Sequence, residues 1–321
     1  MKDKNEFPKT LKAALAHFAN PDTALQFAVS MRWPNGVKCP RCGSVHVSFT
    51  AKRRVWTCED CPNRRQFSFK VGTIMEDSPI GLDKWLIGMW LIASAKNGIS
   101  SYELHRALGI TQKSAWFLGH RIRLALQSGT VEKLSGEVEA DETLIGGLAR
   151  NMHTSRNKRR GRGTGGIGKE IVMGFLERGG KVKAKHLPNV KRETLHNEVR
   201  QNVEPGSHVF TDQWTGYIGL RRGGYIHKVI NHVRAYVRGN VHTNGIENFW
   251  CLLKRCFKGT YVSVEPFHLF RYLDEEVFRF NNREDDDGAR FVKAVSGVTG
   301  RRLTYQTLIG NVSISGRAEA P

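Results

Sequence analysis

The spacing of apolar positions changes along the chain and predicts two kinds of structure. Over residues 81–127 apolar side chains recur at intervals of three and four, starting with Leu82 and Trp85, which is the repeat of amphipathic helices. From residue 136 onward, short apolar runs are bounded by glycines and turn residues, and such runs are typical of β-strands. The chain is therefore expected to contain an all-helical module followed by an α/β module.

Two of the expected helices have the pattern of a helix-turn-helix. Ser100 and Glu103 stand in the register of a capping box, the helix that follows ends at Gly109, and Thr111 is placed to cap a helix over 112–126. Two helices joined by a short glycine-containing turn suit a DNA-binding helix-turn-helix, although a three-helix bundle with a solvated basic face has the same pattern. The side chains expected to contact DNA are Lys113, Arg121 and Arg123.

Downstream, the predicted elements follow one another as three strands, a helix, two strands and a helix. The strands are expected over 136–147, in two runs within 171–184, over 207–212 and over 227–232, and the helices over 192–203 and 246–257. This order is the one expected of an RNase H-like domain. Such a fold supports unrelated activities, so function has to be argued from individual side chains.

Composition and charge indicate the kind of partner. The 321 residues include 50 Lys and Arg against 30 Asp and Glu, a formal net charge of +20, and 40% are hydrophobic, which excludes a chain disordered throughout. A charge of this size indicates that the partner is a polyanion, and double-stranded DNA is the favoured one. The alternative is a basic protein whose charge merely keeps it soluble. The first eight residues have no apolar core, so we expect no secretory signal. The longest apolar stretch, Trp85 to Ala95, is shorter than the roughly 20 residues of a membrane span. We expect no membrane association and a cytoplasmic, nucleoid-associated protein of bacterial type.

Four of the six cysteines have the spacing of a zinc ribbon. Cys39 and Cys42 form one Cys-x2-Cys pair and Cys58 and Cys61 form another, with 15 residues between the pairs. Two such pairs hold one tetrahedral Zn²⁺ through four thiolates, a closed site that stabilises the fold and leaves no position for catalysis. Two disulfides or a redox pair are the alternative. The remaining two cysteines, Cys251 and Cys256, are expected to be free buried thiols.

Three acidic residues stand at positions suited to metal chemistry. Asp141 lies inside the first expected strand, Asp212 at the end of the fourth, and Glu247 in the first turn of the final helix. Phosphoryl transfer on DNA uses two Mg²⁺ (or Mn²⁺) ions roughly 3.5–4 Å apart, held by carboxylate oxygens. We expect Asp141 to bridge both ions and the other two acids to hold one each, although each acid alone could be a capping or ion-paired surface residue. Glu139 shares a strand face with Asp141 and is a reserve candidate for a ligand or supporting role.

Five segments resemble the DDE insertion-sequence transposases that join an N-terminal zinc ribbon to an RNase H-like catalytic core. They are Cys-Pro-Arg-Cys-Gly (39–43), Glu-Ala-Asp-Glu-Thr (139–143), Phe-Thr-Asp-Gln-Trp-Thr-Gly-Tyr (210–217) and the runs 242–255 and 271–283. The likeness extends over roughly residues 20–285. It implies a DDE-type transposase that nicks DNA hydrolytically at terminal inverted repeats and joins the ends to target DNA by transesterification, with Mg²⁺.

The resemblance also implies a catalytic set of Asp141, Asp212, Glu247 and Lys254. Lys254 follows Glu247 by seven residues and therefore shares its helix face, where the resemblance suggests that a cation holds a terminal phosphate. Some relatives have asparagine in place of the third acid, which makes Asn244 the reserve candidate. We prefer Glu247, because a carboxylate neutralises a metal pair better than an amide does.

A basic, glycine-rich run over 150–169 interrupts the α/β module between its first two strands. It holds seven Lys or Arg and no acid, a composition too charged to pack by itself. We expect a loop, disordered without DNA, whose phosphate-contacting residues are Arg156, Lys158, Arg159, Arg160 and Arg162; a merely solvated loop is the alternative. The run also mimics a phosphate-binding loop, but Glu170 stands where Ser or Thr is required, so ATP binding is rejected.

The expected organisation is an α/β RNase H-like catalytic core preceded by a small zinc ribbon and an all-α helix-turn-helix-like module. The boundaries are 1–34 for an N-terminal helical segment, 35–72 for the ribbon, 78–128 for the helix-turn-helix-like module, 135–285 for the RNase H-like domain, and 286–321 for a tail, loosely ordered beyond about 298. The favoured function is cleavage at insertion-sequence ends and strand transfer by a homodimer or larger assembly on DNA. The alternatives are a non-catalytic, sequence-specific DNA-binding protein derived from a transposase, and a structure-selective nuclease of the RNase H type.

Overall fold

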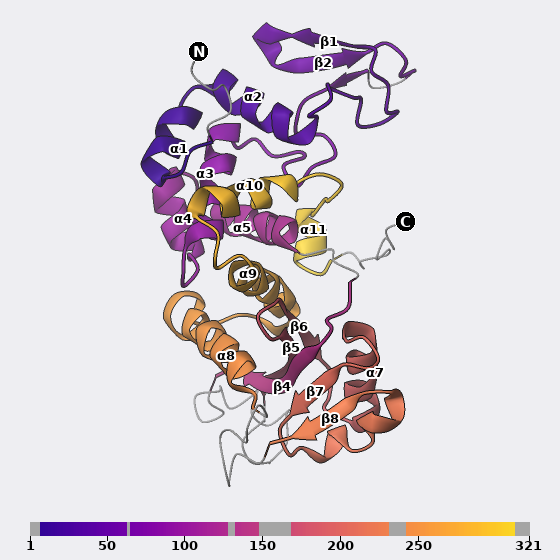
Figure 1. Ribbon diagram of the computed structural model, residues 1–321. Helices are drawn as coiled ribbons and strands as arrows, with labels where there is room; N and C mark the ends of the chain where they lie inside the picture. Colours follow the sequence, from indigo (N-terminus) through magenta and orange to yellow (C-terminus); the bar gives the residue numbers. More distant parts are fainter. Residues whose placement is uncertain (1–6, 63–64, 128–131, 148–167, 231–241, 312–321) are drawn as a thin grey trace. The chain divides into compact units, whose positions relative to one another are not determined.

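The chain forms two compact units (Figure 1). The computed structural model describes residues 7–62, 65–127, 132–147, 168–230 and 242–311. The first unit comprises residues 1–127 and 284–321, and the second comprises residues 128–283. The second unit is therefore inserted, in sequence, between two segments of the first.

Helices form the core of the first unit. In the described residues they are α1 (Leu11–Phe18), α2 (Pro21–Arg32), α3 (Leu82–Ser94), α4 (Ser101–Leu108), α5 (Gln112–Leu126), α10 (Asp287–Ser296) and α11 (Tyr305–Leu308). Most of α3 is buried, including Trp85 and Trp90. The ring of Phe291 on α10 lies 5.1 Å from Trp90 and 5.6 Å from Phe27 of α2, measured between centroids. An aromatic cluster thus joins helices from both ends of the sequence.

Residues 287–308 are an integral part of the first unit, which corrects the expectation of a separate, loosely ordered tail. Phe291 is fully buried. Further on, Arg301 donates to the carbonyls of Ala125 (3.1 Å) and Gln127 (2.9 Å) at the end of α5, where a cation complements unpaired carbonyls and the helix dipole. The sequence pattern missed this packing because the surface that these residues cover belongs to helices far upstream. Residues 312–321 lie outside the described part of the chain.

The ends of α4 and α5 form where the sequence predicts them. The Ser100 hydroxyl accepts from the amide of Glu103 (3.2 Å), and the Glu103 carboxylate accepts from the amide of Ser100 (2.8 Å). Gly109 ends α4 with a φ of 57°, a left-handed conformation that glycine adopts at no steric cost. Thr111 then caps α5 by accepting from the amide of Ser114 (3.2 Å). The two-helix pattern and its capping residues are confirmed.

A small antiparallel sheet completes the first unit. Its strands are β1 (Val47–Thr50), β2 (Val55–Cys58) and β3 (Gln66–Phe67), in that spatial order. The ring of Trp56 on β2 packs between Phe49 at 4.7 Å and Phe67 at 5.9 Å, measured between centroids. So few apolar side chains cannot stabilise a domain of this size without a further cross-link such as a metal.

The second unit is built on a mixed five-stranded sheet with the order β6-β5-β4-β7-β8. The strands are β4 (Glu137–Ile145), β5 (Glu170–Glu177), β6 (Val182–Leu187), β7 (His208–Thr211) and β8 (Ile226–Val229). β5 is antiparallel to both β4 and β6, while β7 is parallel to β4 and β8 is parallel to β7. The strands predicted from the sequence are all present, with ends shifted by a few residues at most.

Helices cover both faces of this sheet. They are α7 (Arg192–Asn202), α8 (Asn244–Cys256) and α9 (Leu269–Asn281). Successive side chains of a strand point to opposite faces: Val138 and Phe175 pack with Leu195 of α7, whereas Val172 packs with Phe249 of α8. The cluster around Phe249 also includes residues of α9. Asp141, an odd-numbered residue of β4, consequently faces α8.

A buried ionic network joins α8 to α9. Arg279 pairs with Glu275 and Glu276, and Glu276 accepts from the thiol of Cys256 at 3.2 Å. Burial, reinforced by the charge of Glu276, raises the pKa of Cys256 to about 12. Cys256 is thus the buried free thiol that the sequence predicts. Cys251 is exposed, which corrects the expectation for that residue: it lies on the solvent side of α8.

Among the described residues, no helix combines the length and the apolar character that a membrane crossing requires.

Candidate active site and metal sites

The four predicted cysteines converge at one point of the ribbon. All four sulfur atoms lie within 4.8 Å of one another, with Sγ–Sγ distances of 3.6 Å for Cys39 to Cys61, 3.6 Å for Cys42 to Cys58 and 3.4 Å for Cys42 to Cys61. Tetrahedral Zn²⁺ with bonds of about 2.3 Å separates its sulfurs by about 3.8 Å. The cluster therefore fits a structural zinc ion. Burial raises the pKa of Cys39, but hydrogen bonds from the backbone amides of Arg41 and Cys42 and from the side chains of Cys42 and Cys61 together lower it to about 7, which favours the thiolate that binds metal.

Asp141 on β4 lies level with Asp212, which stands just beyond the end of the adjacent parallel strand β7. The register of β4 and β7 pairs Glu139 with Phe210. Two residues further along each chain, the same offset brings Asp141 beside Asp212, which directly follows β7. Neighbouring strands are about 4.8 Å apart. Asp212 is further fixed because its Oδ1 accepts from the amide of Trp214 at 3.1 Å.

The helix α8 brings Glu247 to the same edge of the sheet. Two hydrogen bonds attach α8 to β4: the amide of Ile246 donates to Glu139 (3.0 Å), and the indole Nε1 of Trp250 donates to Asp141 Oδ2 (2.9 Å). Glu247 lies between these two contacts in the first turn, where its carboxylate accepts from the Thr243 hydroxyl at 3.0 Å. The structure thus brings all three predicted acids to one region.

Electrostatics support this proximity. Burial, together with the negative charges of Asp212 and Glu247, raises the pKa of Asp141 to about 6, even though the Trp250 hydrogen bond lowers it. In the described residues, only the four cysteines form a group of potential ligands that all lie within 4.8 Å of one another. As placed here, the three acids do not form such a group. A two-ion site holds its ions roughly 3.5–4 Å apart, so its ligand atoms extend over a wider region than those of a one-ion site.

Glu142 and Tyr217 form a second tie between β4 and the segment after β7. The Tyr217 hydroxyl donates to Glu142, on the sheet face opposite to Asp141. Burial, with contributions from Asp141 and Asp212, raises the pKa of Glu142 to about 8. Burial and the neighbouring Glu142 also raise the pKa of Tyr217 well above its ordinary value. This bond holds the loop that begins at Asp212 against the strand that carries Asp141.

The other residues singled out near the acids occupy distinct positions. Lys254 is exposed two turns after Glu247 on α8, and Asn244 is exposed at the first residue of the same helix. Glu139 is buried, and its oxygens are taken by the amide of Ile246 and by Nε of Arg178 at 2.9 Å. Of its two reserve roles, the supporting one fits these contacts.

Sequence reasoning missed Arg178. Its guanidinium donates to Glu139, to Glu137 (3.2 Å) and to the carbonyl of His242 just before α8 (2.8 Å), and it lies 4.0 Å over the ring of Phe210. In the sequence it occupies an ordinary Arg-Gly-Gly turn. No local pattern reveals that this turn lies beside the start of α8, because the partners are up to 64 positions away.

The predicted DNA-contacting residues are only partly accessible. Lys113 is exposed near the start of α5. Arg121 and Arg123 are both 4% exposed, which corrects their assignment to a DNA-facing surface. Arg121 donates to the carbonyls of Leu303 (3.1 Å) and Glu76. The C-terminal segment around Leu303 therefore covers the side of α5 that we expected to face solvent. Arg156, Lys158, Arg159, Arg160 and Arg162 lie outside the described residues.

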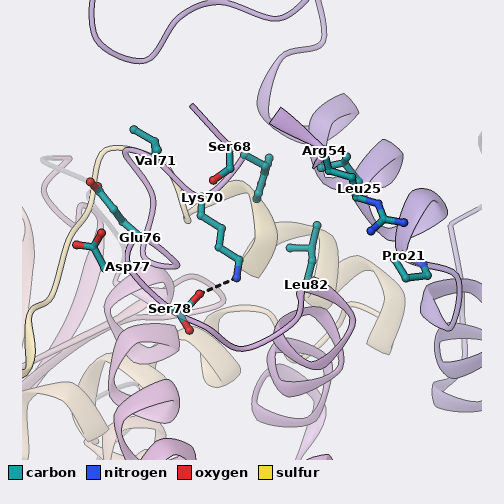
Figure 2. A pocket seen from close by; sticks show the side chains of 11 residues that line it. Pro21, Leu25, Arg54, Ser68, Lys70, Val71, Glu76, Asp77, Ser78 and Leu82 are labelled. Atoms are coloured by element: carbon teal, nitrogen blue, oxygen red, sulfur yellow. Dashed lines mark hydrogen bonds between the residues drawn. The ribbon is translucent and has the colours of Figure 1, made fainter. Parts of the chain in front are cut away.

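The first unit also has an open hollow of about 450 Å³ (Figure 2). Lys70 reaches across it and donates to the carbonyls of Ser78 (2.8 Å) and Ile80 (2.6 Å). On another side, Arg54 pairs with Asp22 at 2.6 Å. Both cations that line the hollow are satisfied by protein groups, so we assign no ligand to it.

Comparison with known proteins finds matches to both parts of the chain. Residues 133–281 match the family described as the ISXO2-like transposase domain, and residues 19–64 match the transposase zinc-ribbon domain. An uncharacterized protein in the transposable element ISH50 of Halobacterium salinarum is 26% identical over 286 residues, covering 83% of this chain and 95% of that protein. An uncharacterized transposase-like protein of Haemophilus influenzae is 36% identical over 104 residues, covering 32% of this chain and 84% of that protein. The chain belongs to the insertion-sequence transposase family that carries the ISXO2-like transposase domain together with a transposase zinc ribbon.

Proposed function

We propose that this protein is an active DNA transposase, which cleaves DNA at the ends of an insertion sequence and transfers the ends into target DNA. Three positions carry the proposal: Asp141 lies on β4, Asp212 directly follows the parallel neighbouring strand β7, and Glu247 lies on a helix attached to β4. The sheet also supports an RNase H-like catalytic core. Its first three strands in the chain, β4, β5 and β6, pair in antiparallel fashion, and β7 and β8 are then added parallel to β4.

The acidic residues have the chemistry required to hold two Mg²⁺ (or Mn²⁺) ions. Bound there, the metals would polarise the scissile phosphate and stabilise the attacking and leaving oxygens. Asp141 is the proposed bridging ligand because both of the other acids lie close enough to contribute to its raised pKa. Glu247 is preferred to the exposed Asn244 as third ligand. Lys254, exposed two turns further along α8, is proposed to hold a DNA phosphate.

The first unit is proposed to recognise double-stranded DNA of the terminal inverted repeats. In helix-turn-helix proteins the first residues of the second helix contact base edges. Here the start of α5, with Thr111 and Lys113, is exposed, whereas the rest of that helix is largely buried. We therefore narrow the proposed DNA contact on α5 to its first turn.

Strand transfer in vitro tests the proposal. Zinc-loaded protein is mixed with labelled DNA carrying the ends that flank its own gene, with Mg²⁺ or EDTA. Joined products that need Mg²⁺ and disappear in Asp141→Asn and Glu247→Gln would support it. Specific binding without cleavage would instead favour the non-catalytic DNA-binding protein.

Transposition requires two DNA ends to be held together, so we also propose a homodimer or larger assembly on DNA. Light scattering of the protein–DNA complex measures this directly. A complex that contains a single protein chain under conditions of active strand transfer would contradict it.

A further inference from the structure

Trp214 is a half-exposed tryptophan beside the acidic cluster. It follows Asp212 by two residues and is 47% exposed, whereas Trp85, Trp90 and Trp250 are at most 4% exposed. Its indole therefore contributes little to the core. Trp214 therefore presents an accessible aromatic surface at the edge of the proposed active site.

One edge of this indole packs against the loop that carries it. The backbone amide of Trp214 donates to Asp212 Oδ1 at 3.1 Å. A Cβ atom on Gly216 would lie 2.9 Å from both Cδ1 and Nε1 of Trp214, so the five-membered ring rests on this glycine. Gly216 in turn packs against Leu195 of α7, because the same added atom would lie 2.7 Å from the leucine Cδ1. One edge of the indole thus packs against the loop, while much of the ring remains exposed.

The surroundings of the loop are basic. Arg192, exposed at the first residue of α7, places its guanidinium directly over Gly219 at the end of the same loop. Residues 213–223 contain no acid and include the exposed Arg221 and Arg222. Proteins that hold single-stranded nucleic acid combine such cations, which contact phosphates, with aromatic rings on which bases stack.

We infer that Trp214 stacks on a nucleobase of the DNA strand whose phosphate is cleaved, with Arg192 contacting a neighbouring phosphate. The inference rests on the proposed function, which brings that strand to Asp141 and Asp212. A base inside a duplex has both faces covered by its neighbours, so the stacked base is one that has left the helix beside the scissile phosphate. Trp214 thus fixes the strand that the acidic residues act on.

The inference is tested by measuring each protein variant on two forms of the DNA, natural and abasic. The full-length protein cleaves a duplex of its own element end that carries either the natural nucleotide or an abasic analogue next to the scissile phosphate. We expect Trp214→Ala to lower kcat/KM about ten- to a hundredfold on natural DNA and less than about threefold on abasic DNA. Trp214→Phe should retain most of the activity, because its ring still stacks. Ile218→Ala, which removes an exposed apolar side chain of the same loop, is the matched control and should behave as wild type. An equal loss on both DNAs, or none on either, would overturn the inference.

Photocrosslinking gives a readout independent of turnover. The wild-type protein is bound, with Ca²⁺ to prevent cleavage, to the same duplex carrying 5-iodouracil at that position. The expected product is a crosslink in the peptide that contains Trp214, absent in Trp214→Ala and present in Ile218→Ala. Mg²⁺-dependent cleavage by wild type without this crosslink would refute the stacking role alone. Absence of cleavage by wild type would refute the proposed function, and the inference with it.

Discussion

Asp141 owes its orientation to a glycine on the neighbouring strand. The register of β4 and β5 pairs Asp141 with Gly174. Because Gly174 has no side chain, the indole of Trp250 lies across it and reaches Asp141 Oδ2 at 2.9 Å. An added Cβ would fall 2.6 Å from Trp250 and 2.8 Å from Ile246. A residue without functional groups therefore determines how a proposed metal ligand is held.

We predict that Gly174→Ala displaces Trp250 and lowers the rate of DNA cleavage. Overpacking of this kind costs about 1–3 kcal/mol, and a misplaced reacting group costs about ten- to a hundredfold in rate. Urea unfolding and single-turnover cleavage measure the two effects. The control is Gly147→Ala, since a Cβ there meets no atom within 4 Å. Wild-type cleavage by Gly174→Ala would contradict the argument.

Burial of His227 makes the stability of the folded protein depend on pH. Burial, with the charges of Arg221 and His196, lowers its pKa to about 4, and its Nε2 lies 2.9 Å from the Thr211 hydroxyl. The unfolded chain takes up a proton at about pH 6.5 and the folded chain does so only near pH 4, so stability is lost as the pH falls through this window. Thermal melts should show a smaller decrease between pH 7 and 4 in His227→Gln than in wild type. Parallel decreases in the two proteins would exclude His227 as the cause.

At the scale of elements, the attachment of α8 to β4 determines where the third acid lies. Glu139 accepts from the amide of Ile246 at the positive end of the helix dipole and from Arg178. Arg178 also binds the carbonyl of His242, immediately before the helix. The start of α8, and Glu247 with it, is therefore attached to the strand that carries Asp141.

We predict that Glu139→Gln destabilises the second unit by about 2–4 kcal/mol, because it leaves a largely buried guanidinium without its best carboxylate. Hydrogen exchange should increase first in peptides from α8. The matched control is Glu137→Gln, which removes the other carboxylate bound to Arg178. That side chain is 41% exposed, so the expected cost is below about 1 kcal/mol. Equal effects of the two substitutions would argue against the attachment.

At the scale of the whole molecule, the two units depend on different parts of the sequence. The first unit is discontinuous, since α10 and the segment after it complete a core begun by α1, α2 and α3. Phe291 and Arg301 make the contacts by which this C-terminal segment packs against the earlier helices. The second unit has its own sheet and its own two clusters of buried side chains.

A chain that ends at Arg283 should consequently lose stability in its first unit. Hydrogen exchange is expected to increase in α3 and α5 and to stay unchanged in the strands β4 to β6. A chain that ends at Asn311 keeps every described contact of Phe291 and Arg301 and is the control. Unchanged protection of α3 after the longer truncation would contradict the role of these residues.

The sequence by itself determined those features that depend on neighbours in the chain. The capping box at Ser100, the turn at Gly109 and the two cysteine pairs involve partners within a few positions, so their spacing alone predicts them. The alternation of apolar residues likewise predicted the strands and helices of the second unit. That order also made Asp141, Asp212 and Glu247 the proposed metal ligands, because each occupies a defined place in it.

Only the tertiary structure decided the features whose partners are distant in sequence. It buried Arg121 under residues some 180 positions away, it placed α10 in the core of the first unit, and it bound Glu139 to the start of α8 and to Arg178. It also brought Arg192 of α7 against the loop that carries Trp214. These outcomes depend on which surfaces pack together, and a polar or charged side chain is buried wherever packing supplies its hydrogen-bond partners. Local pattern carries no information about that choice.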